Sequence, residues 1–192
     1  MQHPFNTTTD GFTLVETLVA ISILMLVIIG PMTVVQKSMQ NAYFANEQVT
    51  ATFLAQQGIE AVRQLRDDEA LNSWDATGTS DTSDWVNTLT ACDAAHDGCE
   101  LSGTGSNKVL QNCGVEGCKI YIEEDTGEYT DSIGGNIDTP FTRRITVDSF
   151  AGGDLVLVTT EVTWMNANIS AGQRSVKLQT YLYDHYKRFE ND

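Results

Sequence analysis

Residues 12–35 read FTLVETLVAISILMLVIIGPMTVV, and this stretch decides the fold because it is apolar almost throughout. A helix of about 24 residues is long enough to cross a hydrocarbon layer about 30 Å thick. Glu16 is the only ionisable residue in the stretch. The sequence therefore predicts one membrane-spanning helix, with an acid whose burial costs a few kcal/mol unless it finds a partner.

The residues before this stretch do not form an ordinary secretory signal. The leading MQHPFNTTTDG contains no Lys or Arg, and the first basic residue is Lys37. The apolar run also exceeds the 7–15 residues that are usual in a cleaved signal. A plain signal anchor would leave Glu16 unexplained.

The segment Gly11 to Glu16, GFTLVE, resembles the class III signal of type IV prepilins and type II secretion pseudopilins. In that family a prepilin peptidase cuts after the glycine, and the new N-terminal residue is methylated. The resemblance implies that residues 1–11 are a leader, that cleavage falls between Gly11 and Phe12, and that Phe12 becomes the methylated terminus. The segments ETLVAISILMLVIIGP and LAQQGIEAVRQLRD are most similar to the minor-pilin and pseudopilin branches.

Glu16 has a physical role in this scheme. Cleavage creates an ammonium group at Phe12 beside an apolar helix, and such a charge is costly to bury without an anion. Glu16 lies one helical turn away and can supply that anion within a subunit or, as the family does, between neighbours. The alternative is that Glu16 is simply solvated at the level of the headgroups.

The resemblance also implies partners and a location. The expected partners are other pilin or pseudopilin subunits, the prepilin peptidase, an inner-membrane assembly platform and membrane lipid. The expected topology is a single pass through a bacterial inner membrane with a cytoplasmic N-terminus, followed by display in a pilus or pseudopilus. The leader carries Asp10 and His3 where the family usually has Lys or Arg, so the positive-inside rule does not supply this orientation.

After Val35 the apolar residues recur mostly every three or four positions, which is a helical period. They are Met39, Tyr43, Phe44, Val49, Phe53, Leu54, Ile59, Val62 and Leu65. We therefore expect residues 12–36 to span the membrane and residues 37–66 to form the amphipathic half of the same helix. Gly30 and Pro31 predict a kink rather than an end, because proline removes an amide donor from the helix.

Residues 67–192 form the expected extracytoplasmic domain. Residues 67–138 contain acidic, Cys-bearing loops, with one short helix near 84–90 and a hairpin whose turn is Asp125-Thr-Gly127. Residues 141–186 predict an antiparallel meander with strands at 141–150, 155–164 and 174–183. An apolar sheet face needs a cover, and the amphipathic half-helix can provide it. The predicted class is α+β, the lollipop arrangement of pilins.

Four cysteines, Cys92, Cys99, Cys113 and Cys118, lie in this domain. An even number in an oxidising compartment predicts two disulfides with three connectivities. Local pairs, Cys92 with Cys99 and Cys113 with Cys118, are favoured because each closes a short loop that contains glycine. A four-thiolate zinc site is the alternative, and the spacing of the first pair fits it poorly.

The remaining polar residues predict no active site. The acidic run of residues 123–138 offers oxygen ligands for calcium but lacks the alternating spacing of an EF-hand, so a solvated acidic face is favoured and no metal ligand is assigned. The three histidines, His3, His96 and His185, stand near no nucleophile pattern, although His96 lies between acids. A net charge of −15 without a basic cluster argues against nonspecific nucleic-acid binding.

Three classes of function are compatible with these features. The favoured one is a structural subunit of a filament, a minor pilin or pseudopilin. The alternative is an adhesin or calcium-dependent binding module that the helix displays on a filament. A membrane-anchored enzyme would require a reactive constellation that the sequence does not contain.

Overall fold

The computed structural model describes residues 11–77, 84–89, 92, 98–103, 108–114, 117–132, 134, 136–150, 155–165 and 172–183. The chain divides into two compact units, residues 1–47 and residues 48–192. We call the second unit the C-terminal domain. The helix α1, Leu14–Thr77, contributes residues to both units.

In the first unit α1 is continuous through Gly30 and Pro31. Proline has no amide hydrogen, so the helix loses one backbone hydrogen bond at this point. The hydroxyl of Thr33 donates to the Gly30 carbonyl oxygen at 2.8 Å. Pro31 therefore does not end the helix, and the kink stays a prediction.

The C-terminal end of α1 lies beyond the expected one. Helix was expected to about Arg66 and loop from Asp67, whereas α1 ends at Thr77. The added residues begin DDEALNSWDA and contain no Gly or Pro before Gly78, and Glu, Ala and Leu are good helix formers. The acidic charge at residues 67–69 was therefore wrongly interpreted as the start of a loop.

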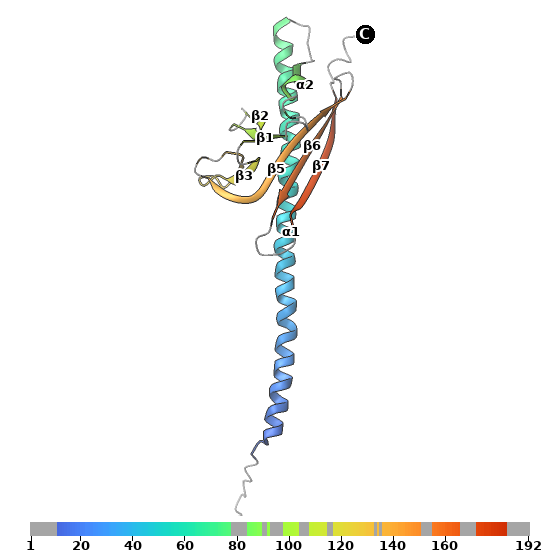
Figure 1. The fold of residues 1–192 in the computed structure, drawn as a ribbon. Coiled ribbons are helices and arrows are strands. Elements are labelled where there is room, and N and C mark those ends of the chain that lie inside the picture. Colours follow the sequence, from blue (N-terminus) through green and yellow to red (C-terminus); the bar gives the residue numbers. More distant parts are fainter. Residues whose placement is uncertain are drawn as a thin grey trace, which may run out of the picture. The chain divides into compact units, whose positions relative to one another are not determined.

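The C-terminal domain is built on one antiparallel sheet, and Figure 1 shows its three long strands, β5, β6 and β7, side by side. The strands are β1 (Cys99–Ser102), β2 (Val109–Asn112), β3 (Lys119–Ile122), β4 (Tyr129–Thr130), β5 (Ile137–Ser149), β6 (Leu155–Trp164) and β7 (Arg174–Tyr183). One edge of β5 pairs with β6, and the other edge pairs with β1 and β3. The long N-terminal helix and the C-terminal antiparallel sheet confirm the predicted α+β class.

Several predicted elements are present. The strands β6 and β7 have the predicted bounds, and β5 starts four residues earlier than predicted. The short helix α2 (Asp84–Leu89) lies where a short helix was expected. The β3–β4 hairpin is also confirmed, and its turn holds Gly127 at φ 72°, a conformation that favours glycine. The strands β1 and β2 were not predicted.

The core of the C-terminal domain lies between α1 and one face of the sheet. Alternate residues of β6 point toward the helix, and Val156, Val158, Thr160 and Val162 are fully buried. The helix face that meets them carries the buried residues Ala51, Leu54, Ala55, Gly58, Ile59 and Val62. The small residues in this face let the helix approach the strands closely. The cover that the sequence predicts for the sheet is thus provided by residues of α1 from position 51 onward.

Candidate functional site

The N-terminal motif forms the start of α1. The helix begins at Leu14, and Thr13 precedes it as the N-cap residue. The Glu16 backbone amide donates to Thr13 Oγ1 at 3.3 Å, and the Thr17 amide donates to the Thr13 carbonyl oxygen at 3.2 Å. A hydroxyl at this position satisfies an amide that the first turn leaves without a partner. The helix therefore begins two residues after the Gly11–Phe12 junction.

Glu16 occupies the third position of the helix, three residues after Thr13. A Thr followed at this spacing by Glu is the sequence pattern of a capping box, and an acid near a helix N-terminus is favoured by the helix dipole. The side chains of Phe12 and Glu16 are both exposed. The first turn thus places an acid one turn from the residue that processing would expose.

The helix that follows is apolar on all sides. Every large apolar side chain from Phe12 to Val35 is more than half exposed. Among the described residues α1 is the one helix that is long and apolar enough to cross a membrane. Polar groups in its first half are satisfied within the helix, since the hydroxyls of Thr17 and Ser22 donate to the carbonyl oxygens of Leu14 and Leu18. Such a surface requires lipid or other apolar helices around it.

Residues 1–10 of the predicted leader, including His3, lie outside the described residues. Gly11 is exposed, with open space where a side chain would be. The predicted roles of Gly11 and Phe12 in cleavage and methylation therefore stay predictions.

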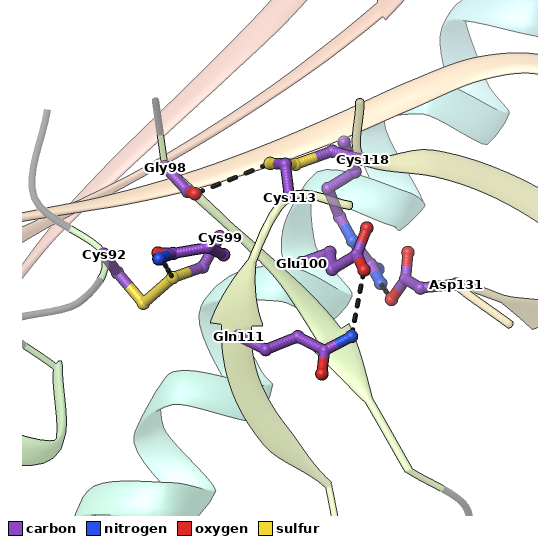
Figure 2. Close-up of a disulfide and its surroundings, with 10 residues drawn as sticks. Cys92, Gly98, Cys99, Glu100, Gln111, Cys113, Cys118 and Asp131 are labelled. Atoms are coloured by element: carbon purple, nitrogen blue, oxygen red, sulfur yellow. Dashed lines mark hydrogen bonds and ion pairs between the residues drawn. A yellow bond between two sulfur atoms is a disulfide. The ribbon is translucent and has the colours of Figure 1, made fainter. Parts of the chain in front are cut away.

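The four cysteines lie in the C-terminal domain and form two bridges, Cys92–Cys99 and Cys113–Cys118. This is the local pairing that the sequence favours. The bridges lie at the same end of the β1–β2 hairpin (Figure 2). The Cys113 amide donates to the Gly98 carbonyl oxygen at 3.4 Å. Since all four sulfur atoms are paired with each other, they do not form the alternative zinc site.

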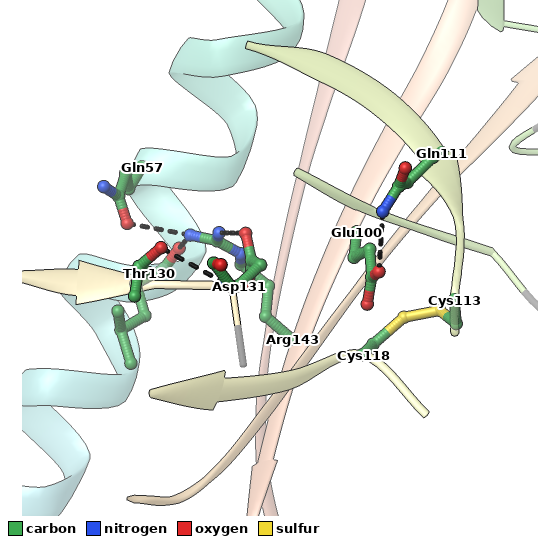
Figure 3. Close-up of polar contacts among 10 residues, drawn as sticks. Gln57, Glu100, Gln111, Cys113, Cys118, Thr130, Asp131 and Arg143 are labelled. Atoms are coloured by element: carbon green, nitrogen blue, oxygen red, sulfur yellow. Dashed lines mark hydrogen bonds and ion pairs between the residues drawn. A yellow bond between two sulfur atoms is a disulfide. The ribbon is translucent and has the colours of Figure 1, made fainter. Parts of the chain in front are cut away.

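A group of polar side chains surrounds a buried ion pair, and we call it the polar cluster. Its members are Gln57, Glu100, Gln111, Asp131 and Arg143 (Figure 3). Arg143 and Asp131 form an ion pair with a distance of 2.5 Å between Nη2 and Oδ2, and each side chain is only 3% exposed. The cluster therefore places a complete ion pair in the interior of the domain.

Arg143 connects the sheet to α1 through its other terminal nitrogen. Its Nη1 donates to Gln57 Oε1 at 2.8 Å and to the Leu54 carbonyl oxygen at 3.3 Å. Its backbone amide donates to the Cys118 carbonyl oxygen at 2.9 Å. One side chain thus links β5, α1 and the segment after β4.

Two acids share this interior. Asp131 faces Arg143, while Glu100 on β1 accepts a hydrogen bond from Gln111 Nε2 at 3.0 Å. Burial raises the pKa of Asp131 above its ordinary value, and this effect outweighs the opposing ones of the Arg143 charge and its hydrogen bond. The negative charge of Glu100 also raises this pKa, while the Leu101 backbone amide lowers it.

The solvated acidic face predicted for residues 123–138 is thus only partly correct. Glu123, Glu124 and Asp125 are at the surface, but Asp131 is buried. Asp138 is 73% exposed and pairs with Lys119, with 2.9 Å between its Oδ2 and Nζ. The prediction failed at Asp131 because its partner, Arg143, is supplied by another strand.

No group of three or more His, Cys, Asp or Glu side chains among the described residues has a geometry suited to a metal ion. His96 and His185, which were considered as ligands or reactive groups, lie outside the described residues.

The sequence analysis missed Arg143, although a signal was present. In FTRRITVDSF the residues Phe141, Arg143, Ile145 and Val147 alternate, so they share one face of the strand. An Arg within an apolar face indicates a buried cation that needs a carboxylate. The sequence alone offers many carboxylates and does not identify which one this is.

Residues 8–30 match the family model described as the prokaryotic N-terminal methylation motif. No curated protein and no solved structure matches the chain. The match covers the leader end, the Gly11–Phe12 junction, Glu16 and much of the apolar helix. Together with the long exposed apolar helix, this motif supports membrane anchoring and display in a filament. The N-terminal segment of the chain, residues 8–30, is thus that of a type IV prepilin-like protein.

Proposed function

We propose that the chain is a minor pilin or pseudopilin, a structural subunit that prepilin peptidase cleaves between Gly11 and Phe12 and that assembles through its N-terminal helix. The observation that carries this proposal is the start of α1. The helix begins within a methylation motif, with a capped first turn and an acid at position 16. The large apolar side chains that follow, as far as Val35, are exposed.

The chemistry of the first turn supports a role in assembly. Cleavage leaves a positively charged nitrogen at Phe12, and a neighbouring apolar helix cannot solvate it. The Glu16 carboxylate compensates this charge when helices pack with a stagger of one turn. Without the carboxylate, an unpaired charge in a water-poor helix bundle costs several kcal/mol.

The same scheme assigns roles to the rest of the chain. Residues 1–11 serve as the leader, residues 12–36 as the membrane and assembly helix, and the C-terminal domain, residues 48–192, as the extracytoplasmic domain. The partners are sibling subunits, the peptidase, the assembly platform of the inner membrane, and lipid. The role is structural and requires no reaction beyond processing.

Substitutions of Glu16 test the proposal. Glu16→Gln and Glu16→Ala should leave the C-terminal domain folded, because Glu16 belongs to a separate compact unit. Incorporation into filaments should fall sharply, and Glu16→Asp should be intermediate because the charge remains on a shorter side chain. The measurement compares the amount of each variant that co-purifies with filaments with its amount in the membrane fraction.

Glu60→Gln is the matched control. It makes the same chemical change on the same helix, at an exposed acid that pairs with Arg63 three residues away. Wild-type incorporation of this variant together with loss of Glu16→Gln supports the proposal. Wild-type incorporation of Glu16→Ala contradicts it and indicates that Glu16 is merely solvated at the headgroups.

A further inference from the structure

The polar cluster contains two buried acids and one buried cation. Glu100 and Asp131 are both buried, and we call them the buried acid pair. Arg143 forms its ion pair with Asp131, whereas Glu100 accepts a hydrogen bond from the neutral amide of Gln111. If both acids are ionised, these three side chains carry one uncompensated negative charge in the interior. Such a charge is costly in a medium of low polarity.

A second observation concerns an atom of the same pair. Asp131 Oδ1 is buried and has no hydrogen-bond partner of ordinary geometry within the described part of the chain. Its other oxygen, Oδ2, receives Arg143 Nη2. A buried carboxylate oxygen without such a partner is unfavourable when it carries charge, and protonation of the pair removes that charge.

We propose that Glu100 and Asp131 form a proton-binding site, so that the C-terminal domain takes up one proton when it folds and releases it as the pH rises. The proton bonds to a carboxylate oxygen of the pair and comes from solvent. The remaining carboxylate and Arg143 then balance each other, and the interior becomes neutral.

A proton fits this site better than a metal ion. The described residues bring no third acidic ligand to the pair. A divalent cation would also lie beside the guanidinium group of Arg143, which already occupies Asp131 Oδ2. Hard cations such as calcium need six or more oxygen ligands, and the pair offers few that are free.

The neighbours of Asp131 define its electrostatic environment. The charged groups that face it are Arg143 from β5 and Glu100 from β1. The helix α1 contributes the neutral Gln57, which contacts Arg143, and β2 contributes the neutral Gln111, which contacts Glu100. Gln57 also lines a surface groove together with Lys108 and Glu128, so the cluster lies close to a solvent-filled space with which protons exchange.

The direction of the effect follows from the raised pKa of Asp131, whose ordinary value is 3.8. Just above that value the unfolded chain has lost this proton, while the folded domain still holds it. Folding is therefore favoured by acid in this window, and the contribution is lost as the pH rises through the pKa of the folded state. This behaviour is opposite to that of an ordinary surface aspartate in an ion pair.

The test is urea unfolding of the full-length chain in detergent micelles at several values between about pH 4.5 and 7.5. The fluorescence of Trp85 and Trp164, which are 4% and 3% exposed, reports on the core of the C-terminal domain. We compare wild type with Asp131→Asn, which keeps the shape of the side chain but cannot bind the proton. For each pH unit, the factor by which the unfolding equilibrium constant of wild type rises should be up to ten times the factor for Asp131→Asn.

Asp138→Asn is the matched control, because it removes the same charge from an exposed partner of Lys119. It should keep the wild-type pH dependence, which separates the site from the general effect of the net charge. Equal pH dependence of wild type and Asp131→Asn overturns the proposal. If Asp131→Asn does not fold, Glu100→Gln provides the test. Removing this second acid should reduce the pH dependence of unfolding, and an unchanged pH dependence overturns the proposal.

Discussion

Gly58 on α1 lies so close to Thr160 on β6 that a methyl group at position 58 would stand 2.8 Å from Thr160 Cγ2 and 3.1 Å from its Oγ1. Thr160 is fully buried. A glycine inside a helix normally costs stability relative to alanine. Here the absence of a side chain is what allows the helix to pack onto the sheet.

Gly58→Ala should destabilise the C-terminal domain, although alanine is the better helix former. Overpacking destabilises by about 1–3 kcal/mol, and the better helix propensity of alanine offsets about 1 kcal/mol of this. We therefore expect a net loss of about 1 kcal/mol in the free energy of unfolding. Combining Gly58→Ala with Thr160→Ser should recover part of the loss, because serine lacks Cγ2. Denaturant unfolding measures both effects, with the exposed Gln56→Ala as the control. A stabilised Gly58→Ala variant would show that the contact is not close.

Arg143→Met should be strongly destabilising. It removes the donors to Asp131, Gln57 and Leu54 and leaves a buried carboxylate without its cation, which costs about 3–5 kcal/mol. Arg143→Lys should be intermediate, because one ammonium group cannot reproduce the forked geometry. The exposed neighbour Arg144 provides the control, and Arg144→Met should cost much less than Arg143→Met. Equal effects at the two positions would refute the role of the cluster.

The sequence predicted the helix and the long strands because each has a regular pattern over many residues. Strands β6 and β7 are rich in β-branched and aromatic residues and are bounded by Gly- and Asn-containing segments. The strands β1 (CELS) and β2 (VLQN) were not predicted because each is short and poor in β-branched and aromatic residues, unlike the equally short β3 (KIYI). Their position depends on pairing with each other and on the contact of Cys99 with Ile145 in β5.

The two candidate sites differ in how far apart their residues lie in the sequence. The assembly motif is contiguous, so Gly11, Phe12 and Glu16 could be assigned from residues 11–16 alone. The polar cluster brings together Gln57, Glu100, Asp131 and Arg143 from four separate segments. Asp131 lies in an acidic run that is polar enough to be at the surface, and only its tertiary neighbours show that it is buried.

The disulfides should contribute to stability separately. Replacing Cys92 and Cys99 together by alanine should cost about 2–4 kcal/mol, and so should the same change at Cys113 and Cys118, because each bridge restricts the unfolded chain. Denaturant unfolding measures these losses, and peptide mapping without reductant gives the pairing. Peptides that join Cys92 or Cys99 to Cys113 or Cys118 would contradict the pairing.

Accessibility should also distinguish the two bridges. Cys92, Cys99 and Cys118 are fully buried, while Cys113 is partly exposed. A small thiol reductant should therefore attack the Cys113–Cys118 bridge first, because thiol exchange needs access to a sulfur atom. Timed alkylation of the folded chain followed by mass spectrometry follows both bridges. Earlier labelling of Cys92 and Cys99 would count against the burial described here.

The cap of α1 offers a test at the assembly motif. Thr13→Val removes the oxygen that accepts from the Glu16 amide and should weaken the first turn by about 1 kcal/mol. Thr13→Ser retains this oxygen and should behave as wild type. Hydrogen exchange of the Glu16 amide in micelles reports the difference, and equal exchange rates in the two variants would show that the hydroxyl does not cap the helix.

The central claim is that the chain is processed as a prepilin and assembles through the helix that starts beside Phe12. Mass spectrometry of the N-terminal peptide, from protein in the filament fraction of the native host, tests it most directly. The account predicts a peptide that starts at Phe12 and carries one methyl group on its nitrogen. Filaments that contain only the uncut form starting at Met1 would contradict it.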